Sequence, residues 1–146
     1  KGLVLLGAVP QDALVLDKWF ALQAGAWRWS DAAPPTLDRV EALTEDPAFS
    51  LTNPNKVYAL LGTFFRANPG EFHREDGAGY AFWSDQVIRL NSHNPQVAAR
   101  TARALENWRR YTPDLQAVIR PHLEAVLNTP GLSRDVREII EKALAD

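Results

Sequence analysis

The chain has no cysteine and no methionine among its 146 residues. The absence of cysteine excludes disulfide bonds, thiolate zinc sites and a thiol nucleophile. It also fits a reducing compartment such as the cytoplasm, without requiring one. Because the sequence begins with Lys1 and contains no methionine, we interpret it as a piece of a longer protein.

Charge of one sign is not in excess either, since 16 basic and 18 acidic side chains give a net charge of -2. The densest basic cluster consists of Arg103, Arg109 and Arg110, on a predicted helix. Nucleic-acid binding needs basic side chains gathered on one face of a protein. We therefore interpret this cluster as a solvated helix face and expect no nucleic-acid partner.

Long apolar segments are also missing. The apolar run Leu3–Val9 stops at Pro10, whereas a helix that crosses a bilayer needs about 20 apolar residues. We predict that this run forms the last turn of a helix, and we expect no membrane partner.

Helical periodicity is the clearest pattern that the sequence does contain. Apolar residues recur three and four positions apart, which is typical of one buried helix face, and no stretch alternates like a strand. The pattern predicts an all-α fold in a single domain, 1–146. The predicted helices are 11–25, 36–45, 54–67, 77–92, 95–110, 113–128 and 133–145, with a short turn at 69–74.

Proline marks most of the predicted helix starts. A polar residue that can cap a helix stands before a proline four times, at Asn53-Pro54, Asn68-Pro69, Asn94-Pro95 and Thr112-Pro113. Ser133 is the predicted cap of the last helix. The spacing from Asn53 to Asn94 is close to the period of HEAT and armadillo repeats, roughly 40–47 residues. This favours stacked antiparallel helix pairs over a closed bundle.

Two details depart from simple helices. Pro121 falls inside the predicted helix 113–128, where we expect a kink near Val118. The connection 26–35 contains Trp27 and Trp29, which we interpret as anchors that hold this loop on the core.

Residue chemistry alone nominates no catalytic set. The three histidines form no His-Glu-x-x-His pair, and the serines lie in no Gly-x-Ser-x-Gly turn. His73 lies near Glu71, Glu75 and Asp76, so a metal site there is conceivable, but a hydrogen-bonding turn histidine is the favoured interpretation. Gly77-Ala78-Gly79 is interpreted as a turn that starts a helix, with Asp76 as its cap. We therefore predict no metal ligand and no catalytic residue in this chain.

Several phrases in order resemble one known family. These are Leu16-Asp17-Lys18-Trp19-Phe20, Thr52-Asn53-Pro54-Asn55-Lys56-Val57, Asn68-Pro69-x-x-Phe72-His73-x-x-Asp76-Gly77-x-Gly79-Tyr80 and Leu90-Asn91-x-x-Asn94-Pro95-Gln96-Val97-Ala98-x-Arg100. Together they are similar to the C-terminal helical domain of the bacterial aminopeptidase N zinc peptidases. Such a domain is a HEAT- or armadillo-like superhelix of antiparallel helix pairs.

The resemblance implies a role for this chain inside a larger enzyme. Members of the family remove N-terminal residues from peptides with one zinc ion, which a separate catalytic domain holds. By implication this chain covers that site and gates or lines substrate access, and has no cofactor of its own. Its expected partners are the remaining domains of its own chain and peptide substrates. The parent is expected to be cytoplasmic and monomeric.

The resemblance also suggests three residues that line the substrate channel. Arg100 ends the Asn-Pro-Gln-Val-Ala phrase and matches an arginine that can project inward in the family, although an ion pair between helices is an equal alternative. Tyr58 stands where some relatives have a second arginine, and Asn94 begins the same phrase as Arg100.

The alternative hypothesis is a free-standing helical-repeat module that binds protein partners. One expectation separates the two hypotheses. A domain cut from a larger superhelix should have an exposed apolar face where missing helices pack, and the fragment should self-associate. A free-standing adaptor should behave as a monomer. A small-molecule bundle has less support, because no polar cluster interrupts the apolar stripes.

Overall fold

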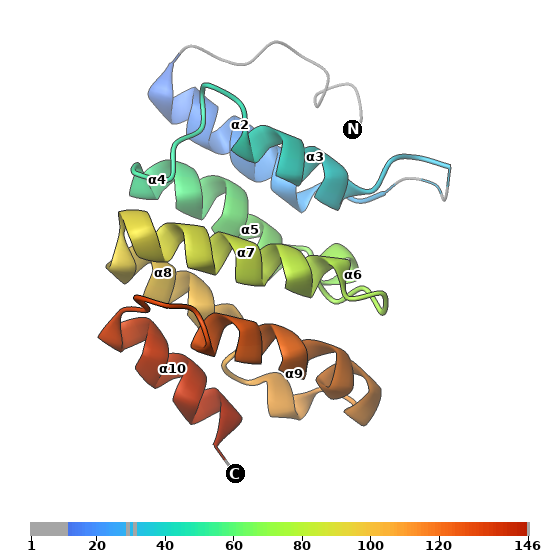
Figure 1. The fold of residues 1–146 in the computed structure, drawn as a ribbon. Coiled ribbons are helices and arrows are strands. Elements are labelled where there is room, and N and C mark those ends of the chain that lie inside the picture. The colour runs from blue at the N-terminus through green and yellow to red at the C-terminus, as the bar shows by residue number, and fades with distance from the viewer. Residues whose placement is uncertain (1–11, 29, 31, 146) are drawn as a thin grey trace. The chain divides into compact units, whose positions relative to one another are not determined.

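The structure is a computed structural model that describes residues 12–28, 30 and 32–145. Within these ranges it consists of helices, turns and loops, with no strand (Figure 1). The predicted all-α class is therefore confirmed. The predictions for Leu3–Val9 and Trp29 lie outside the described residues. Contacts divide the chain into two compact units, 1–72 and 73–146.

The described part of the first unit is built around one helix, which packs against four later elements. The elements are α2 (Ala13–Gly25), α3 (Thr36–Thr44), α4 (Pro54–Val57), the π-helical turn η1 (Tyr58–Gly62), α5 (Thr63–Ala67) and α6 (Pro69–Phe72). Helix α2 contacts α3, α4, η1 and α5. Its inward face includes Phe20, which meets Phe49 edge-on, while Leu60 and Phe64 are fully buried on η1 and α5. The apolar stripe predicted for 54–67 therefore forms the core of this unit.

A buried lysine in this unit takes part in an ion pair. Lys56, on α4, is only 7% exposed, and its Nζ donates to Asp17 Oδ1 on α2. A buried ammonium group is costly unless it is paired, so Asp17 stabilises the position of Lys56. Each residue belongs to one of the phrases that carried the family resemblance, and here each one has a structural contact.

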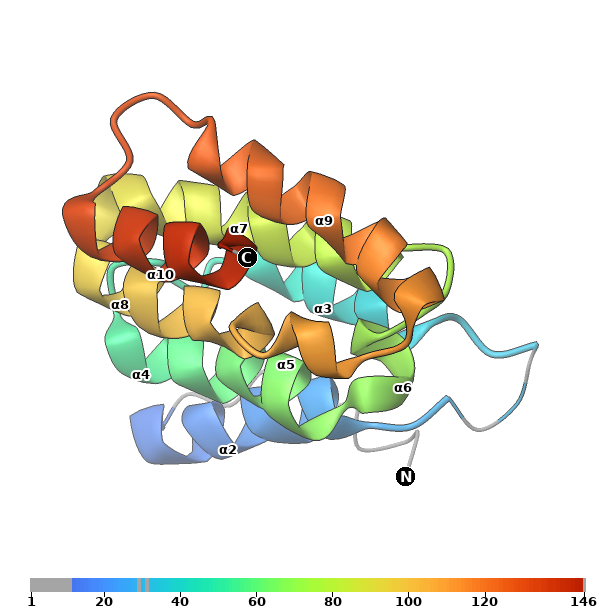
Figure 2. The same ribbon diagram turned by 90° about the horizontal axis from the view of Figure 1, so that it is seen from below.

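The second unit combines the longer helices α7 (Ala78–His93), α9 (Pro113–Leu127) and α10 (Arg134–Leu144) with several shorter segments (Figure 2). The elements are α7 (Ala78–His93), α8 (Pro95–Ala102), the 3-10 turns η2 (Arg103–Leu105) and η3 (Trp108–Arg110), α9 (Pro113–Leu127) and α10 (Arg134–Leu144). Helix α7 contacts α8 and α9, and α10 contacts the same two helices. Trp83 and Trp108 are buried, and both indole groups donate to backbone carbonyls.

A single asparagine connects α7 to the loop between α9 and α10. The Asn91 side-chain amide donates to Gly131 O at 3.1 Å, and Asn91 Oδ1 accepts from the Ser133 N–H at 2.9 Å. Ser133 in turn caps α10 by accepting from the Val136 N–H. The start of α10 is thus fixed by a residue that lies about 40 positions earlier.

Most of the predicted helix caps are confirmed. The side chain of Asn53 accepts from the first turn of α4, and Asn94 does the same for α8. Thr112 caps α9, and a proline follows each of these three caps. These starts were predictable because a capping side chain and a pre-set proline φ act locally.

Asn68 does not follow this pattern. Its side-chain amide donates to Ala24 O at 2.9 Å and Ala26 O at 3.0 Å, so it binds carbonyls at the end of α2. These carbonyls are among those that a helix end leaves without intrahelical donors. The Asn68 side chain therefore binds the C-terminal end of α2, while the residue itself directly precedes α6.

The predicted helix 95–110 was wrong in its second half. Regular α-helix ends at Ala102, and tighter 3-10 turns follow at η2 and η3. At this point the Trp83 indole donates to Thr101 O at 3.0 Å. Further on, Trp108 donates to Ala143 O at 2.8 Å, and Arg109 binds Leu144 O and Ala145 O at 2.9 Å. These tertiary contacts outweigh the local preference for helix.

Two further expectations fared differently. Helix α9 continues through Pro121 from Pro113 to Leu127, and the kink near Val118 stays a prediction. The interpretation of Trp27 as a loop anchor was wrong, because its side chain is 85% exposed.

Among the described helices, none is both long and apolar enough to cross a membrane.

Candidate functional site

Two of the three predicted channel residues lie on α8. Arg100 is exposed in the last turn of the helix, whereas Val97, Ala98 and Thr101 are buried. A cation there is favoured by the partial negative charge at a helix C-terminus. Asn94 is half-buried at the other end, where Oδ1 accepts from the N–H groups of Gln96 and Val97. The structure therefore places the two residues at opposite ends of one helix, and Asn94 has a capping role.

Tyr58, the third predicted residue, is half-buried in the other unit. It begins the π-helical turn that joins α4 to α5. Single π turns occur in proteins mostly inside α-helices and often at functional sites. The channel-lining role of all three residues stays a prediction.

A second candidate is an aromatic cluster around His73 at the start of the second unit. His73 Nδ1 is hydrogen-bonded to Tyr80 Oη at 2.8 Å. The Tyr111 ring lies 4.7 Å from the imidazole, measured between ring centroids. The predicted hydrogen-bonding role of His73 is therefore confirmed, although its partner comes from the following helix.

The titration behaviour of this cluster follows from burial. Burial lowers the pKa of His73 below its usual value of 6.5. Burial and the neighbouring Tyr111 raise the pKa of Tyr80 to about 12. Both groups are therefore neutral near pH 7. A neutral His–Tyr pair positions helix α7, whereas acid–base catalysis near pH 7 calls for a group whose pKa is close to that value.

The turn before α7 combines a side-chain cap with a glycine. Asp76 Oδ1 accepts from the Ala78 N–H at 3.0 Å, as predicted, and Oδ2 accepts from Arg74 at 2.6 Å. The backbone bond to Ala78 and then Arg74 hold the pKa of Asp76 below its ordinary value. Gly77 has a φ of 80°, a conformation that favours glycine, and a Cβ there would lie 2.9 Å from Val118 Cγ1.

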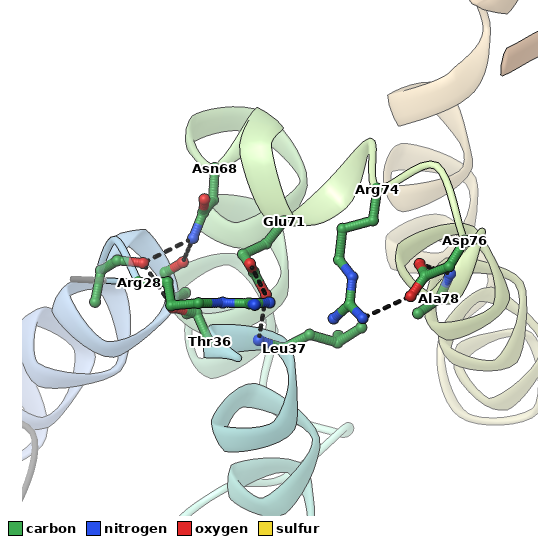
Figure 3. Close-up of polar contacts among 10 residues, drawn as sticks. Arg28, Thr36, Leu37, Asn68, Glu71, Arg74, Asp76 and Ala78 are labelled. Carbon is green, nitrogen blue, oxygen red and sulfur yellow. Dashed lines mark hydrogen bonds and ion pairs between the residues drawn. The ribbon is translucent and has the colours of Figure 1, made fainter. Parts of the chain in front are cut away.

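Glu71 forms the centre of a third polar group, in the first unit (Figure 3). Its Oε2 accepts from Arg28 at 3.1 Å, and its Oε1 accepts from the Leu37 N–H at 3.2 Å. Thr36 Oγ1 donates to Ala26 O at 2.8 Å, beside the contacts of Asn68. These bonds fix both ends of the connection between α2 and α3.

Two of the three carboxylates near His73 in sequence bind other partners. Glu71 binds Arg28 and the start of α3, and Asp76 binds Arg74 and the start of α7. In the part of the chain that the structure describes, no three residues of the types that ligate metals come together. The geometry shown here is that of a scaffold whose polar groups position helices.

Comparison with known proteins identifies the family. Residues 7–145 match a family described as "Domain of unknown function (DUF3458_C) ARM repeats". The match covers nearly all of the chain. The chain belongs to this ARM-repeat family. Armadillo repeats consist of stacked helices, as the sequence periodicity predicted.

Relatives of this ARM-repeat chain include aminopeptidases. Aminopeptidase N of Caulobacter vibrioides is 42% identical over 155 residues, which cover 97% of this chain and 17% of the relative. Aminopeptidase N of Escherichia coli is 42% identical and matches 92% of this chain and 15% of its own length. The predicted resemblance to aminopeptidase N is confirmed.

A solved structure gives the same result for the fold. Legionella pneumophila aminopeptidase A, crystallised in complex with aspartic acid, superimposes with a TM-score of 0.81 and 35% sequence identity. The similarity covers 92% of this chain and 15% of that one. The chain thus spans between 15 and 17% of the length of these relatives.

Sequence reasoning missed the Glu71 group and the partner of His73. The phrase Asn68-Pro69-x-x-Phe72-His73 includes Asn68 and His73 as a resemblance but leaves position 71 unspecified. The signal for Glu71 was an absence, because Pro35 precedes α3 and makes no side-chain capping bond there. A helix start without its own cap indicates that a group from elsewhere in the fold is needed.

Proposed function

We propose that this chain is the C-terminal ARM-repeat domain of a zinc-dependent aminopeptidase. In this role it covers the active-site cavity and limits the access of peptides, while the chemistry takes place in another domain. The single observation that carries the proposal is the 42% identity to two aminopeptidases N over almost the whole chain.

The described residues fit a covering role better than a catalytic one. The polar groups around Glu71, Asp76 and Asn94 all bind the ends of helices. Among the described residues, no group of three or more His, Asp or Glu side chains that could hold a metal ion is present. We therefore place the zinc ion, and the residues that bind it, in the remaining domains of the parent chain.

Arg100 is the residue that we propose faces the peptide. It is exposed on α8, and no other position of that helix carries an arginine or lysine. A guanidinium group can donate two parallel hydrogen bonds to a carboxylate. Arg100 would therefore bind the C-terminal carboxylate or a backbone carbonyl of a short peptide, beyond the bond that is cut.

Peptides with and without a free C-terminus test this role in the full-length enzyme. We expect Arg100→Ala to raise the KM for a tripeptide with a free carboxylate by about ten-fold, because a hydrogen bond to a charged group is lost. The same variant should barely change the KM of the amidated tripeptide. Arg103→Ala is the matched control, since Arg103 is also exposed and pairs with Glu106. Equal effects on both peptides would rule out carboxylate binding.

Metal content and activity test whether zinc binding and catalysis belong to another domain of the parent chain. The parent protein is expected to contain one zinc ion per chain and to release N-terminal residues from peptides. The 146-residue chain alone should do neither. Aminopeptidase activity that stays with this chain through repeated purification would contradict the proposal.

A further inference from the structure

The turn before α7 contains the one aspartate of the sequence that is followed by glycine, at Asp76 and Gly77. Glycine has no Cβ, so nothing on the residue itself shields its backbone nitrogen from the preceding side chain. The Asp76 side chain is also accessible to water, with 54% of its surface exposed. Sequence and exposure thus single out Asp76 as an aspartate that can react with its own backbone.

The reaction is an intramolecular condensation. The Gly77 nitrogen attacks Asp76 Cγ, an N–C bond forms, and the amide proton leaves with the carboxyl OH group as water. Water then opens the cyclic imide. Addition at Cγ restores aspartate, whereas addition at the main-chain carbonyl carbon breaks the original peptide bond and leaves isoaspartate, with the main chain running through Cγ. One water molecule is released and one is consumed, so the atoms balance without a further reactant.

In the folded chain, hydrogen bonds engage each of the two reacting groups with another partner. The Gly77 N–H donates to Arg74 O at 3.0 Å. Asp76 Oδ1 accepts from the Ala78 N–H at 3.0 Å, and Oδ2 accepts from the Arg74 guanidinium group at 2.6 Å (Figure 3). The nitrogen and the carboxyl group must turn toward each other to react, so these bonds have to break first.

Arg74 is the residue that holds both reacting groups. Its main-chain oxygen binds the Gly77 nitrogen and its side chain binds the Asp76 carboxylate. Packing adds a second restraint, since a Cβ at Gly77 would lie 2.9 Å from Val118 Cγ1, so this stretch of main chain lies close against α9.

We propose that Asp76 and Gly77 form a site of spontaneous isoaspartate formation, and that Arg74 is the residue that sets its rate in the folded protein. The modification is a property of this turn, and it does not depend on whether the parent chain is a peptidase.

The restraint by the fold is modest, because the groups lie near the surface. The side chains of Arg74 and Asp76 are 23% and 54% exposed, and an exposed ion pair stabilises a protein little. The ends of helices also open more readily than their centres. The turn therefore slows the reaction without stopping it, and isoaspartate accumulates as the protein ages.

Isoaspartate would change the start of α7. It lengthens the main chain by one carbon atom and shortens the side chain by one, so the carboxylate loses its present position beside the Ala78 N–H. The lengthened segment also joins His73 to Tyr80, whose side chains are hydrogen-bonded at 2.8 Å. One covalent change thus acts on both the cap of α7 and the contact between His73 and Tyr80.

Peptide mapping of the full-length protein, aged in oxygen-18 water at pH 7.4 and 37 °C, tests the proposal. Trypsin releases 75–89, which contains Asp85 as well as Asp76, so each digest has an internal reference. Ring opening incorporates the label, and electron-transfer fragmentation distinguishes isoaspartate from aspartate. We expect isoaspartate at 76 to form at least about ten-fold more slowly in the folded protein than in guanidinium chloride. At Asp85 it should form more slowly than at Asp76 in guanidinium chloride.

A variant of the turn assigns the protection to Arg74. We expect Arg74→Ala to raise the rate at 76 about three-fold in the folded protein, because the exposed ion pair is lost. The same variant should leave the rate in guanidinium chloride unchanged. Arg134→Ala is the matched control, since it removes a surface ion pair with Glu138 on α10 and should change neither rate. Circular dichroism before ageing establishes that each variant is folded.

Hydrogen exchange measures the effect of the modification on α7. The amides of its first turn should exchange about five-fold faster after Arg74→Ala has aged, because the cap is lost. Aged Arg74→Ala/Asp76→Ser should show no such change, since a serine hydroxyl can cap a helix but cannot form the cyclic imide.

Three results would overturn the proposal. Equal rates at 76 in the folded protein and in guanidinium chloride would show that the turn gives no protection. Isoaspartate at Asp85 as fast as at Asp76 in guanidinium chloride would show that the glycine creates no special site. A folded Arg74→Ala variant that reacts at the unsubstituted rate would exclude Arg74 as the residue that sets it.

Discussion

Glu71 accepts a hydrogen bond from the backbone N–H of Leu37, with 3.2 Å between Oε1 and N. Helix α3 follows Pro35, which makes no side-chain capping bond, so a carboxylate 34 residues later in the chain takes the place of the cap. The negative charge also lies favourably at a helix N-terminus. The same carboxylate pairs with Arg28, which lies in the loop between α2 and α3. The beginning of α3 thus depends on the end of α6.

Removal of this carboxylate should destabilise the first unit. We expect Glu71→Ala to lower the free energy of unfolding by about 2 kcal/mol, because a buried N–H and a partly buried guanidinium group lose their acceptor. Glu71→Gln should cost less, since its amide oxygen can still accept from Leu37. Urea unfolding followed by circular dichroism measures both. Glu75→Ala, at an exposed position, is the control, and an equal loss there would contradict the assigned role.

Alanine substitutions at two glycines distinguish the energetic cost of backbone strain from the cost of steric overlap. Gly77 and Gly131 have φ values of 80° and 74°, so alanine at either position should cost about 1 kcal/mol. A Cβ at 77 would also lie 2.9 Å from Val118 Cγ1, whereas a Cβ at 131 meets nothing within 4 Å. We therefore expect Gly77→Ala to cost about 1 to 2 kcal/mol more than Gly131→Ala.

The urea midpoints of the two alanine variants measure this difference. In a chain that carries Val118→Ala, the methyl group that would overlap the new Cβ is absent. Gly77→Ala should therefore lower the free energy of unfolding by less in that chain than in the parent chain. Equal losses for the two glycine variants would show that Val118 moves aside freely.

Acid should destabilise the second unit through its buried histidines. Burial lowers the pKa of His73 and of His122 below 6.5, so the unfolded chain binds more protons than the folded one as the pH falls past that value. The free energy of unfolding should therefore be lower at pH 5.5 than at pH 7.5. Urea midpoints at the two values test this.

Variants assign that pH dependence to particular groups. His73→Gln/His122→Gln should show a smaller change between pH 7.5 and pH 5.5, because neither glutamine titrates. His93→Gln, at an exposed position, is the matched control and should keep the dependence of the parent chain. A double variant as sensitive to acid as the parent would show that other groups are responsible.

The parts of the fold that were predictable from sequence are those that local chemistry determines. Asn53, Asn94, Thr112 and Ser133 cap the helices that they were predicted to start, because each cap binds within its own first turn. Apolar periodicity likewise predicted the buried side of 54–67, although it gave no sign of the π-helical turn inside it.

The features that sequence reasoning did not predict share a different cause. The amide of Asn68 binds the end of a helix 44 residues earlier, and Trp108 reaches a carbonyl 35 residues later. Neither partner can be inferred from neighbouring residues, so Asn68 was assigned as an ordinary cap and 95–110 as one helix. For the same reason the phrases that resemble the aminopeptidase family singled out Asp17 and His73 but did not predict what these residues contact.

The bridge from Asn91 to the loop before α10 has a kinetic consequence. The two bonds to Gly131 and Ser133 join parts of the chain that are about 40 residues apart, so they cannot form until that long loop has closed. Interactions that form only after the transition state act mainly on the rate of unfolding. We therefore expect the bonds of Asn91 to contribute little to how quickly the second unit assembles and much to how long it stays assembled.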